Sequence, residues 1–270
     1  MAEGTKNLAL FCDFENIALG VRDANYARFE IQEVLERLLV KGNIVVKKAY
    51  CDWERYKGFK AGMHEASFEL IEIPHVRQSG KNSADIRMVV DALDLCYTKS
   101  HVDTFVIMSG DSDFSPLVSK LRENNKLVIG VGVKNSTSEL LIANCDEFIY
   151  YDDLIRVVER RKPQAKKTAS RKENGERPAK GGKESRESRA EKAFDQVLET
   201  IDDLFEERGE EEKVWGSMVK QALKRRKPGF NESYHGFRSF GKLLEDMEAR
   251  GMLKLEHDQK SGGYIIREVL

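Results

Sequence analysis

The sequence has few cysteines, and their positions do not suggest metal binding or disulfide formation. Four are scattered along 270 residues, without a Cys-x-x-Cys pair or a cysteine–histidine cluster. This distribution argues against a zinc site and a disulfide framework, and it is typical of reduced thiols. No apolar run approaches the roughly 20 residues that a membrane-spanning helix needs, and residues 1–6 lead into an expected strand without a signal-peptide pattern. We therefore expect a soluble, cytoplasmic protein with no membrane contact.

A strong net charge is also lacking. The formal charge at pH 7 is −1, so the chain as a whole has no electrostatic preference for nucleic acid. The charge is unevenly distributed, because residues 159–192 carry 13 Lys and Arg against 6 Glu, and this leaves −8 on the remainder. The same segment has almost no apolar side chains to offset the entropy cost of ordering. We predict a flexible basic linker over 159–192, between domains at 1–158 and 193–270.

The first domain alternates strand and helix patterns. Apolar, partly β-branched runs predict strands over 8–12, 44–51, 68–73, 105–109, 127–132 and 147–151. Helical spacing falls between them, over 31–39, about 52–65, 85–93, 113–121 and 137–143, and Gly42 is expected to cap the first of these helices. Such alternation is typical of βαβ units with right-handed crossovers. The predicted fold class is α/β, a Rossmann-like domain with a mostly parallel sheet.

Acidic residues follow two of the predicted strands. The run 105–109 is wholly apolar before it reaches Ser-Gly-Asp-Ser-Asp, which places Asp111 and Asp113 at the carboxyl end of a buried strand. The first strand ends at Asp13 in the same way, and Asp85 opens a helix that is expected to begin near the same edge. Open α/β sheets bind their ligands at this edge. We therefore expect these acids to lie together.

Four carboxylates at one edge predict a metal site. Asp13, Asp85, Asp111 and Asp113 would repel one another at neutral pH unless a divalent cation neutralised them. Oxygen ligands without histidine or cysteine select Mg²⁺ or Mn²⁺. Such an ion lowers the pKa of a bound water and holds a phosphate oxygen, which is the chemistry of phosphodiester hydrolysis. Glu15 is expected to face solvent instead of binding a ligand.

Two further residues complete the candidate site. Asn16, on the turn after the first strand, has an amide that can orient a carboxylate or a metal-bound water, and Lys81 can contact a phosphate. The alternative for individual acids is structural, because an Asp after a strand often caps a helix, which applies to Asp113 and Asp85. Asp91 lies about 240° further round the helix from Asp85 and is expected to point elsewhere.

Several of these segments together resemble a known family. They are Phe11–Asn16 (FCDFEN), Lys81–Asp85 (KNSAD), Ser109–Phe114 (SGDSDF) and Gly132–Leu140. Over roughly residues 5–155 the chain is similar to NYN domains, PIN-like nuclease domains that include the LabA-like bacterial proteins. The resemblance implies a Mg²⁺-dependent ribonuclease whose matching residues are the four acids named above and Asn16. Many relatives have a shorter Lys-Gly-x-Asp loop, so the resemblance supports a site role for Asp85 more strongly than one for Lys81.

The second domain has the pattern of a small winged helix. Helical spacing around 194–205, 218–223 and 237–247 precedes two short strands that flank the turn-like segment 258–263. Val214–Phe230 and the Tyr-x-Gly-Phe that follows resemble the LOTUS (OST-HTH) domain, over roughly 193–268. That family is linked to RNA binding, and some members instead dock proteins.

Basic side chains gather at the end of the second helix of this domain. They suit phosphate contacts without sequence readout: Lys220, Lys224, Arg225, Arg226 and Lys227. The alternative is a solvated basic face beside an acidic helix that carries Asp202, Asp203, Glu206 and Glu207.

Together these features predict a divalent-metal-dependent endoribonuclease. The LOTUS-like module would hold single-stranded or structured RNA, or a protein partner, close to the metal site. A non-catalytic RNA-binding or docking scaffold that keeps the acidic pocket is the alternative. Phosphatase-like and Toprim-type sites also use acids at strand ends. A phosphatase-like site needs a second Asp two residues after its nucleophile, where this chain has Glu15. A Toprim-type site needs a catalytic Glu at the rim, where this chain has Asp13 and Asn16.

Overall fold

The structure is a computed structural model that describes residues 5–73, 83–156, 186–209, 212–259 and 262–270. Lys81 and most of the predicted linker lie outside these residues. The chain divides into two compact units, one built on a six-stranded sheet and the other on a three-stranded sheet. Within the described residues, no helix has the length and apolarity needed to cross a membrane.

The first unit is a parallel α/β sheet. Its strands are β1 (Lys6–Asp13), β2 (Gly42–Cys51), β3 (Glu69–Glu72), β4 (Thr104–Met108), β5 (Leu127–Gly132) and β6 (Glu147–Tyr150). They lie in the order β3-β2-β1-β4-β5-β6, and every neighbouring pair is parallel. The predicted fold class is confirmed.

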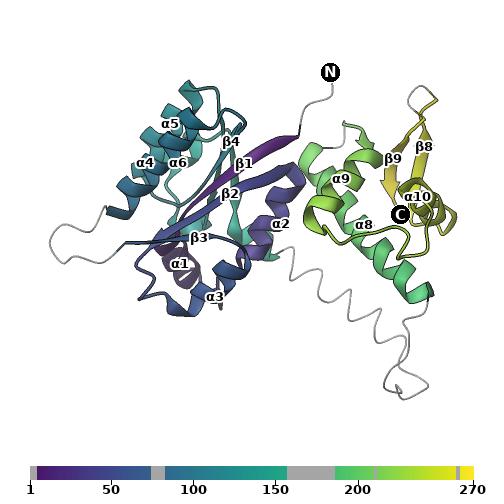
Figure 1. Ribbon diagram of the computed structural model, residues 1–270, viewed down its shortest axis with the longest axis horizontal. Coiled ribbons are helices and arrows are strands. Elements are labelled where there is room, and N and C mark those ends of the chain that lie inside the picture. Colours follow the sequence, from purple (N-terminus) through teal and green to yellow (C-terminus); the bar gives the residue numbers. More distant parts are fainter. Residues whose placement is uncertain (1–4, 74–82, 157–185, 210–211, 260–261) are drawn as a thin grey trace, which may run out of the picture. The chain divides into compact units, whose positions relative to one another are not determined.

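Helices cover both faces of this sheet (Figure 1). They include α1 (Phe14–Asp23), α3 (Lys57–Glu65), α4 (Ser83–Thr98), α5 (Ser115–Glu123) and α6 (Glu139–Asn144), with 3₁₀ turns η1 (Ser112–Phe114) and η2 (Lys134–Ser136). Helix α2 (Ile31–Lys41) is divided, with residues 31–35 in the first unit and 36–41 in the second. Helix α4 carries the chain from the edge strand β3 to β4, next to β1. The strand order therefore reverses between β1 and β4, and ligand sites of open α/β sheets lie at such a reversal.

The register of β1 and β4 brings their carboxyl ends level. Cys12 pairs with Met108, so the residues that follow, Asp13 and Ser109, leave the sheet side by side. All five residues of β4 are buried, as predicted for a central parallel strand. The rings of Phe11 and Phe105 stack across the two strands at 6.0 Å. This packing fixes the edge at which the acids emerge.

Two local features differ from the predictions. The turn expected after Asp13 is the start of the ten-residue helix α1. Its Gly20, which lowers helix propensity, lies where a Cβ would come within 2.3 Å of Ser136 Oγ, so close packing explains the glycine. Gly42 directly follows the last residue of α2, where the sequence predicts the helix to end, but its φ is not positive as in a left-handed glycine cap. It is the first residue of β2, and a Cβ there would lie 2.4 Å from the carbonyl oxygen of Lys6.

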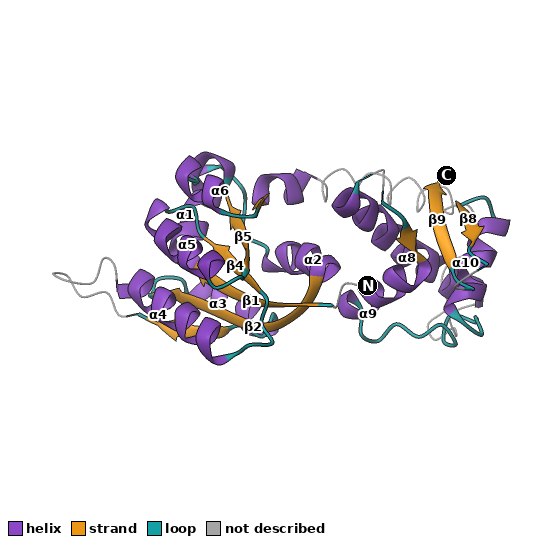
Figure 2. Cartoon of the chain, turned by 90° about the horizontal axis from the view of Figure 1, so that it is seen from above, coloured by secondary structure: helices purple, strands orange, loops and turns teal. Residues whose placement is uncertain are grey.

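The second unit combines three helices with an antiparallel sheet. The helices are α8 (Arg186–Arg208), α9 (Gly216–Arg226) and α10 (Phe240–Ala249), and the strands are β7 (Val214–Trp215), β8 (Leu253–His257) and β9 (Tyr264–Val269), in the order β7-β9-β8. Figure 2 shows β8 and β9 as paired orange strands. The three helices and the hairpin match the prediction. The two-residue strand β7 is too short to leave a periodic signal, and α8 begins inside the segment predicted as linker.

Candidate functional site at the carboxyl edge of the sheet

A chain of hydrogen bonds joins the ends of β1 and β4. The backbone N–H of Asp111 donates to Ser109 Oγ at 3.1 Å. The Ser109 hydroxyl donates in turn to Asp13 Oδ2 at 2.9 Å. Asp13 is only 8% exposed and Ser109 is fully buried. The Asp13 carboxylate and the backbone of Asp111, 98 positions apart in the sequence, are therefore linked through one serine.

Asn16 ties the same two strand ends together from the other side. Its Oδ1 accepts the backbone N–H of Gly110 at 2.8 Å, and its own backbone N–H donates to Asp13 Oδ1 at 3.4 Å. Asp13 is thus the N-cap of α1 as well as a site residue. The amide oxygen of Asn16 positions the turn after β4.

Asp111, not Asp113, is the capping residue at the start of the helical segment after β4. Its Oδ1 accepts the backbone N–H of Asp113 at 2.9 Å, which caps η1. Helix α5 begins two residues after Asp113, with Pro116 in its first turn, as expected. The side chain of Asp113 is left exposed beside the rim.

The electrostatics place Asp13 in an environment that disfavours its charge. Burial raises the pKa of Asp13 from 3.8 to about 7. The hydrogen bond from Ser109 lowers this pKa, while the negative charges of Asp85 and Asp111 raise it further. A buried carboxylate near two other acids is a position that a bound cation would stabilise.

Asp85 belongs to the same acidic group. It lies in the first turn of α4 and is half-buried, and its pKa is raised by burial and then by the charges of Asp111, Asp113 and Glu15. Glu15, expected to face solvent, is therefore within electrostatic reach of Asp85. Its carboxylate also pairs with Arg55 at 3.2 Å, which places one cation beside the acids.

The residues that anchor α4 could not be identified from the sequence. The Tyr50 hydroxyl donates to Asp91 Oδ2 at 2.9 Å, and Lys48 and Arg87 lie 3.3 and 3.1 Å from the same carboxylate. Tyr50 is paired with Asp13 in the register of β1 and β2. Asp91 thus fastens the helix that carries Asp85 to the strand beside Asp13.

The donor types fit a hard divalent cation, although the ligands are not already gathered around one. Among the residues that the structure describes, no three His, Cys, Asp or Glu side chains are arranged to hold a metal ion. The group at the edge is nevertheless made of carboxylates alone, which Mg²⁺ and Mn²⁺ prefer. Burial and the charges of Asp85 and Asp111 raise the pKa of Asp13, and a bound cation would lower it. These side chains would have to move closer together to share one ion.

Gly110 allows the turn after β4 to pass close to the segment that follows β5. A Cβ on Gly110 would lie 2.3 Å from the backbone carbonyl oxygen of Ser136, which cannot rotate away. We expect Gly110→Ala to lower the free energy of unfolding by about 1–3 kcal/mol. The matched control is Gly58→Ala, because a Cβ on Gly58, in α3, would meet nothing within 4 Å. Urea unfolding of both variants tests this, and equal stability of the two would contradict it.

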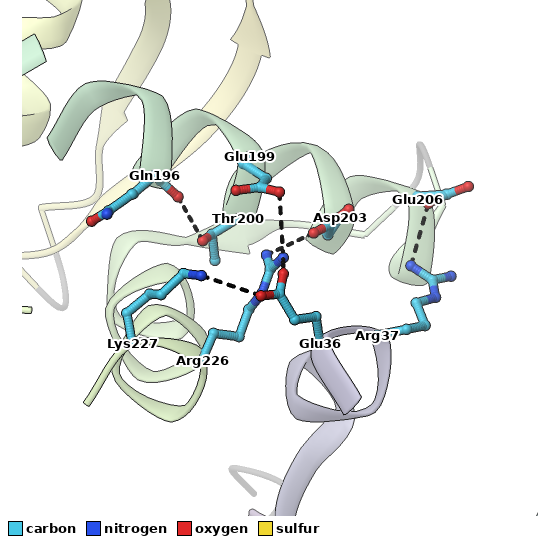
Figure 3. A network of polar contacts seen from close by, with 9 residues as sticks. All are labelled: Glu36, Arg37, Gln196, Glu199, Thr200, Asp203, Glu206, Arg226 and Lys227. Carbon is cyan, nitrogen blue, oxygen red and sulfur yellow. Dashed lines mark hydrogen bonds and ion pairs between the residues drawn. The ribbon is translucent and has the colours of Figure 1, made fainter. Parts of the chain in front are cut away.

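The basic residues of α9 are less available than their number suggests. Arg226 lies 2.7 Å from Asp203 and 3.6 Å from Glu199, both on α8 (Figure 3). Lys220 pairs with Glu232 at 2.8 Å. Arg225 and Lys227 are partly exposed, whereas Lys224 is exposed. The acidic helix and the basic helix end thus pair in part with each other.

Comparison with known proteins places the first unit in a family. Residues 7–153 match the NYN domain family. Meiosis regulator and mRNA stability factor 1 of Xenopus tropicalis is 26% identical over 155 residues, which are 57% of this chain and 9% of that protein. An uncharacterized protein of Methanocaldococcus jannaschii is 27% identical over 139 residues, 52% of each chain. This chain thus spans about half of one relative and a small part of the other.

A solved structure shares the fold of the first unit. It is a protein of unknown function from Vibrio parahaemolyticus, with a TM-score of 0.50 and 26% identity, and the match covers 57% of this chain and 98% of that one. The family match includes β1, β4 and the four acids of the site. The chain belongs to the NYN domain family.

Proposed function

We propose that this protein is a divalent-metal-dependent ribonuclease that cuts RNA internally. The observation that carries the proposal is the Asp111–Ser109–Asp13 hydrogen-bond chain at the point where the strand order reverses. NYN domains belong to the PIN-like nuclease superfamily, and one relative is named as an mRNA stability factor. Both support a nuclease role that is directed at RNA.

In this proposal the ion is held by Asp13, Asp85, Asp111 and Asp113. A bound Mg²⁺ or Mn²⁺ activates water and neutralises charge on the phosphate. The chain's own residues position the acids. Ser109 orients the Asp13 carboxylate, and Asn16 holds the turn that carries Asp111.

The second unit is assigned a supporting role as a LOTUS-like module that binds RNA or docks a protein. Its candidate phosphate contacts are Lys220, Lys224, Arg225, Arg226 and Lys227, and Lys81 is a further candidate in the first unit. Of these five residues, four on α9 and Lys227 just after it, Lys224 is the most exposed. Tethering this module to the nuclease unit raises the local RNA concentration without a fixed interface between them. The free cysteines agree with an action in the reducing cytoplasm.

The second candidate is a scaffold that binds RNA or protein without cutting. One observation favours it, namely that no three acidic side chains in the described part of the chain are already arranged as metal ligands. A scaffold would bind single-stranded RNA and leave it intact at any metal concentration.

The test is cleavage of an internally labelled single-stranded RNA under metal control. We expect fragments with Mn²⁺ or Mg²⁺, none with excess EDTA, and full recovery when excess Mn²⁺ is added back. Removal of the ion eliminates the charge compensation that the four acids need. Cleavage that persists in EDTA would contradict the proposal, and RNA binding without cleavage under every condition would favour the scaffold.

A further inference from the structure

Helix α4 presents an apolar stripe on its outer side. Ile86, Val90 and Tyr97 are 63%, 56% and 65% exposed, and Leu93 between them is partly exposed. The intervals of four, three and four residues place all four side chains within about 60° around the helix. Figure 1 shows α4 as an outer helix beside α5. These exposed side chains thus form one continuous surface along three turns.

This stripe lies beside the side that α4 buries against the sheet, and Leu93 belongs to both because it also packs against the core. Met88, Ala92 and Cys96 form the buried side. The outer side borders a shallow groove of about 560 Å³, lined by Ser83, Ile86, Arg87, Val90, Asp91 and Asp94. A monomer gains nothing from a second apolar side, and contiguous exposed apolar surface usually marks an interaction site.

We propose that this stripe binds the same stripe of a second copy of the chain, with the two α4 helices antiparallel about a two-fold axis. The axis would pass between Val90 and Leu93. Val90 would then pack against Leu93 of the partner subunit, and Ile86 against Tyr97 of the partner subunit. A surface that is its own complement is what an isologous dimer requires.

The charges beside the stripe favour a second copy over other occupants. Arg87 and Asp94 lie on the same flank of the helix, two turns apart. The two-fold axis therefore places Arg87 next to Asp94 of the partner subunit, and the same pair forms twice. Within the described residues the Asp94 carboxylate forms no ion pair, while Arg87 bonds Asp91 through Nε alone. Lys48 and Arg87 already pair with Asp91, so Asp94 is the carboxylate on this flank that would repel phosphate groups of RNA.

Sedimentation velocity of the full chain, from about 1 to 100 µM, tests the proposal. A single helix pair is at the small end of specific interfaces, so we expect a monomer–dimer equilibrium within this range. Val90→Glu should weaken dimerisation at least about tenfold, because it buries a charge at the centre of the contact. Leu140→Glu is the control, since Leu140 is a similarly exposed (58%) helical residue on α6. Far-UV circular dichroism checks that both variants fold.

A charge swap provides the second test. Arg87→Glu and Asp94→Arg should each weaken the dimer, and the double variant should recover most of the loss, because the pair is rebuilt with its signs exchanged. A wild-type chain that remains monomeric throughout the range would overturn the proposal. So would a dimer that Val90→Glu leaves unchanged, or a double variant that is no stronger than the singles. None of these readouts depends on RNA cleavage.

Discussion

Asp13→Asn is expected to reduce metal-dependent RNA cleavage by about 10²- to 10³-fold. Asparagine keeps the size of the side chain and an oxygen that can accept a hydrogen bond from the Ser109 hydroxyl, so the hydrogen bond between the ends of β1 and β4 is retained. What it removes is the negative charge at the most buried position of the acidic group. The loss should therefore appear in the cleavage rate and not in the fold.

The matched control is Asp23→Asn. Asp23 is the last residue of α1 and its exposed side chain pairs only with the neighbouring Arg22 among the contacts described. Initial cleavage rates of the three proteins, at saturating Mn²⁺ and equal concentration, give the comparison. A wild-type rate for Asp23→Asn with a loss for Asp13→Asn assigns the effect to the site. Equal rates for all three would contradict the role of Asp13.

The same substitution is expected to change how stability depends on pH when metal is absent. Burial raises the pKa of Asp13 from 3.8 to about 7 in the folded chain. Between these two pH values the folded chain binds more protons at Asp13 than the unfolded chain does, so stability falls as pH rises through this window. Over the whole window the free energy of unfolding falls by about 4 kcal/mol at most. Asparagine at position 13 has no group that titrates in this window, so the variant lacks this pH dependence of stability.

In EDTA we therefore expect Asp13→Asn to be more stable than wild type at pH 8, and the two to be equally stable below about pH 4. Urea unfolding at several pH values measures the difference. Adding Mn²⁺ at pH 8 should stabilise wild type and not the variant, because an ion that binds only the folded chain adds to its stability. Parallel pH profiles for the two proteins would show that Asp13 carries no uncompensated charge.

The parts of the site that the sequence predicted are those set by topology. Parallel strands place their carboxyl ends at a common edge, so Asp13 and Asp111 had to emerge there once both segments were identified as strands. The serine between them was not identified. Ser109 lies within the Ser-Gly-Asp-Ser-Asp segment, but its role depends on the lateral register of β1 and β4, which is a tertiary property.

Contacts between distant residues were predicted least well. The Tyr50–Asp91 hydrogen bond spans 41 positions, and only the packing of α4 on β2 brings its partners together. The basic end of α9 was identified from composition alone. Its pairing of Arg226 with Asp203 depends on how α8 packs against α9, so counting charges overstated the cations available to RNA.

The central claim is that acids from separate strands serve a single ion. A double-mutant cycle on RNA cleavage, with Asp13→Asn, Asp111→Asn and the combined variant at saturating Mn²⁺, tests it most directly. If both carboxylates hold the same ion, either substitution alone should cost nearly as much as the two together. Losses that multiply in the combined variant would mean that the two residues act independently, and they would contradict a shared site.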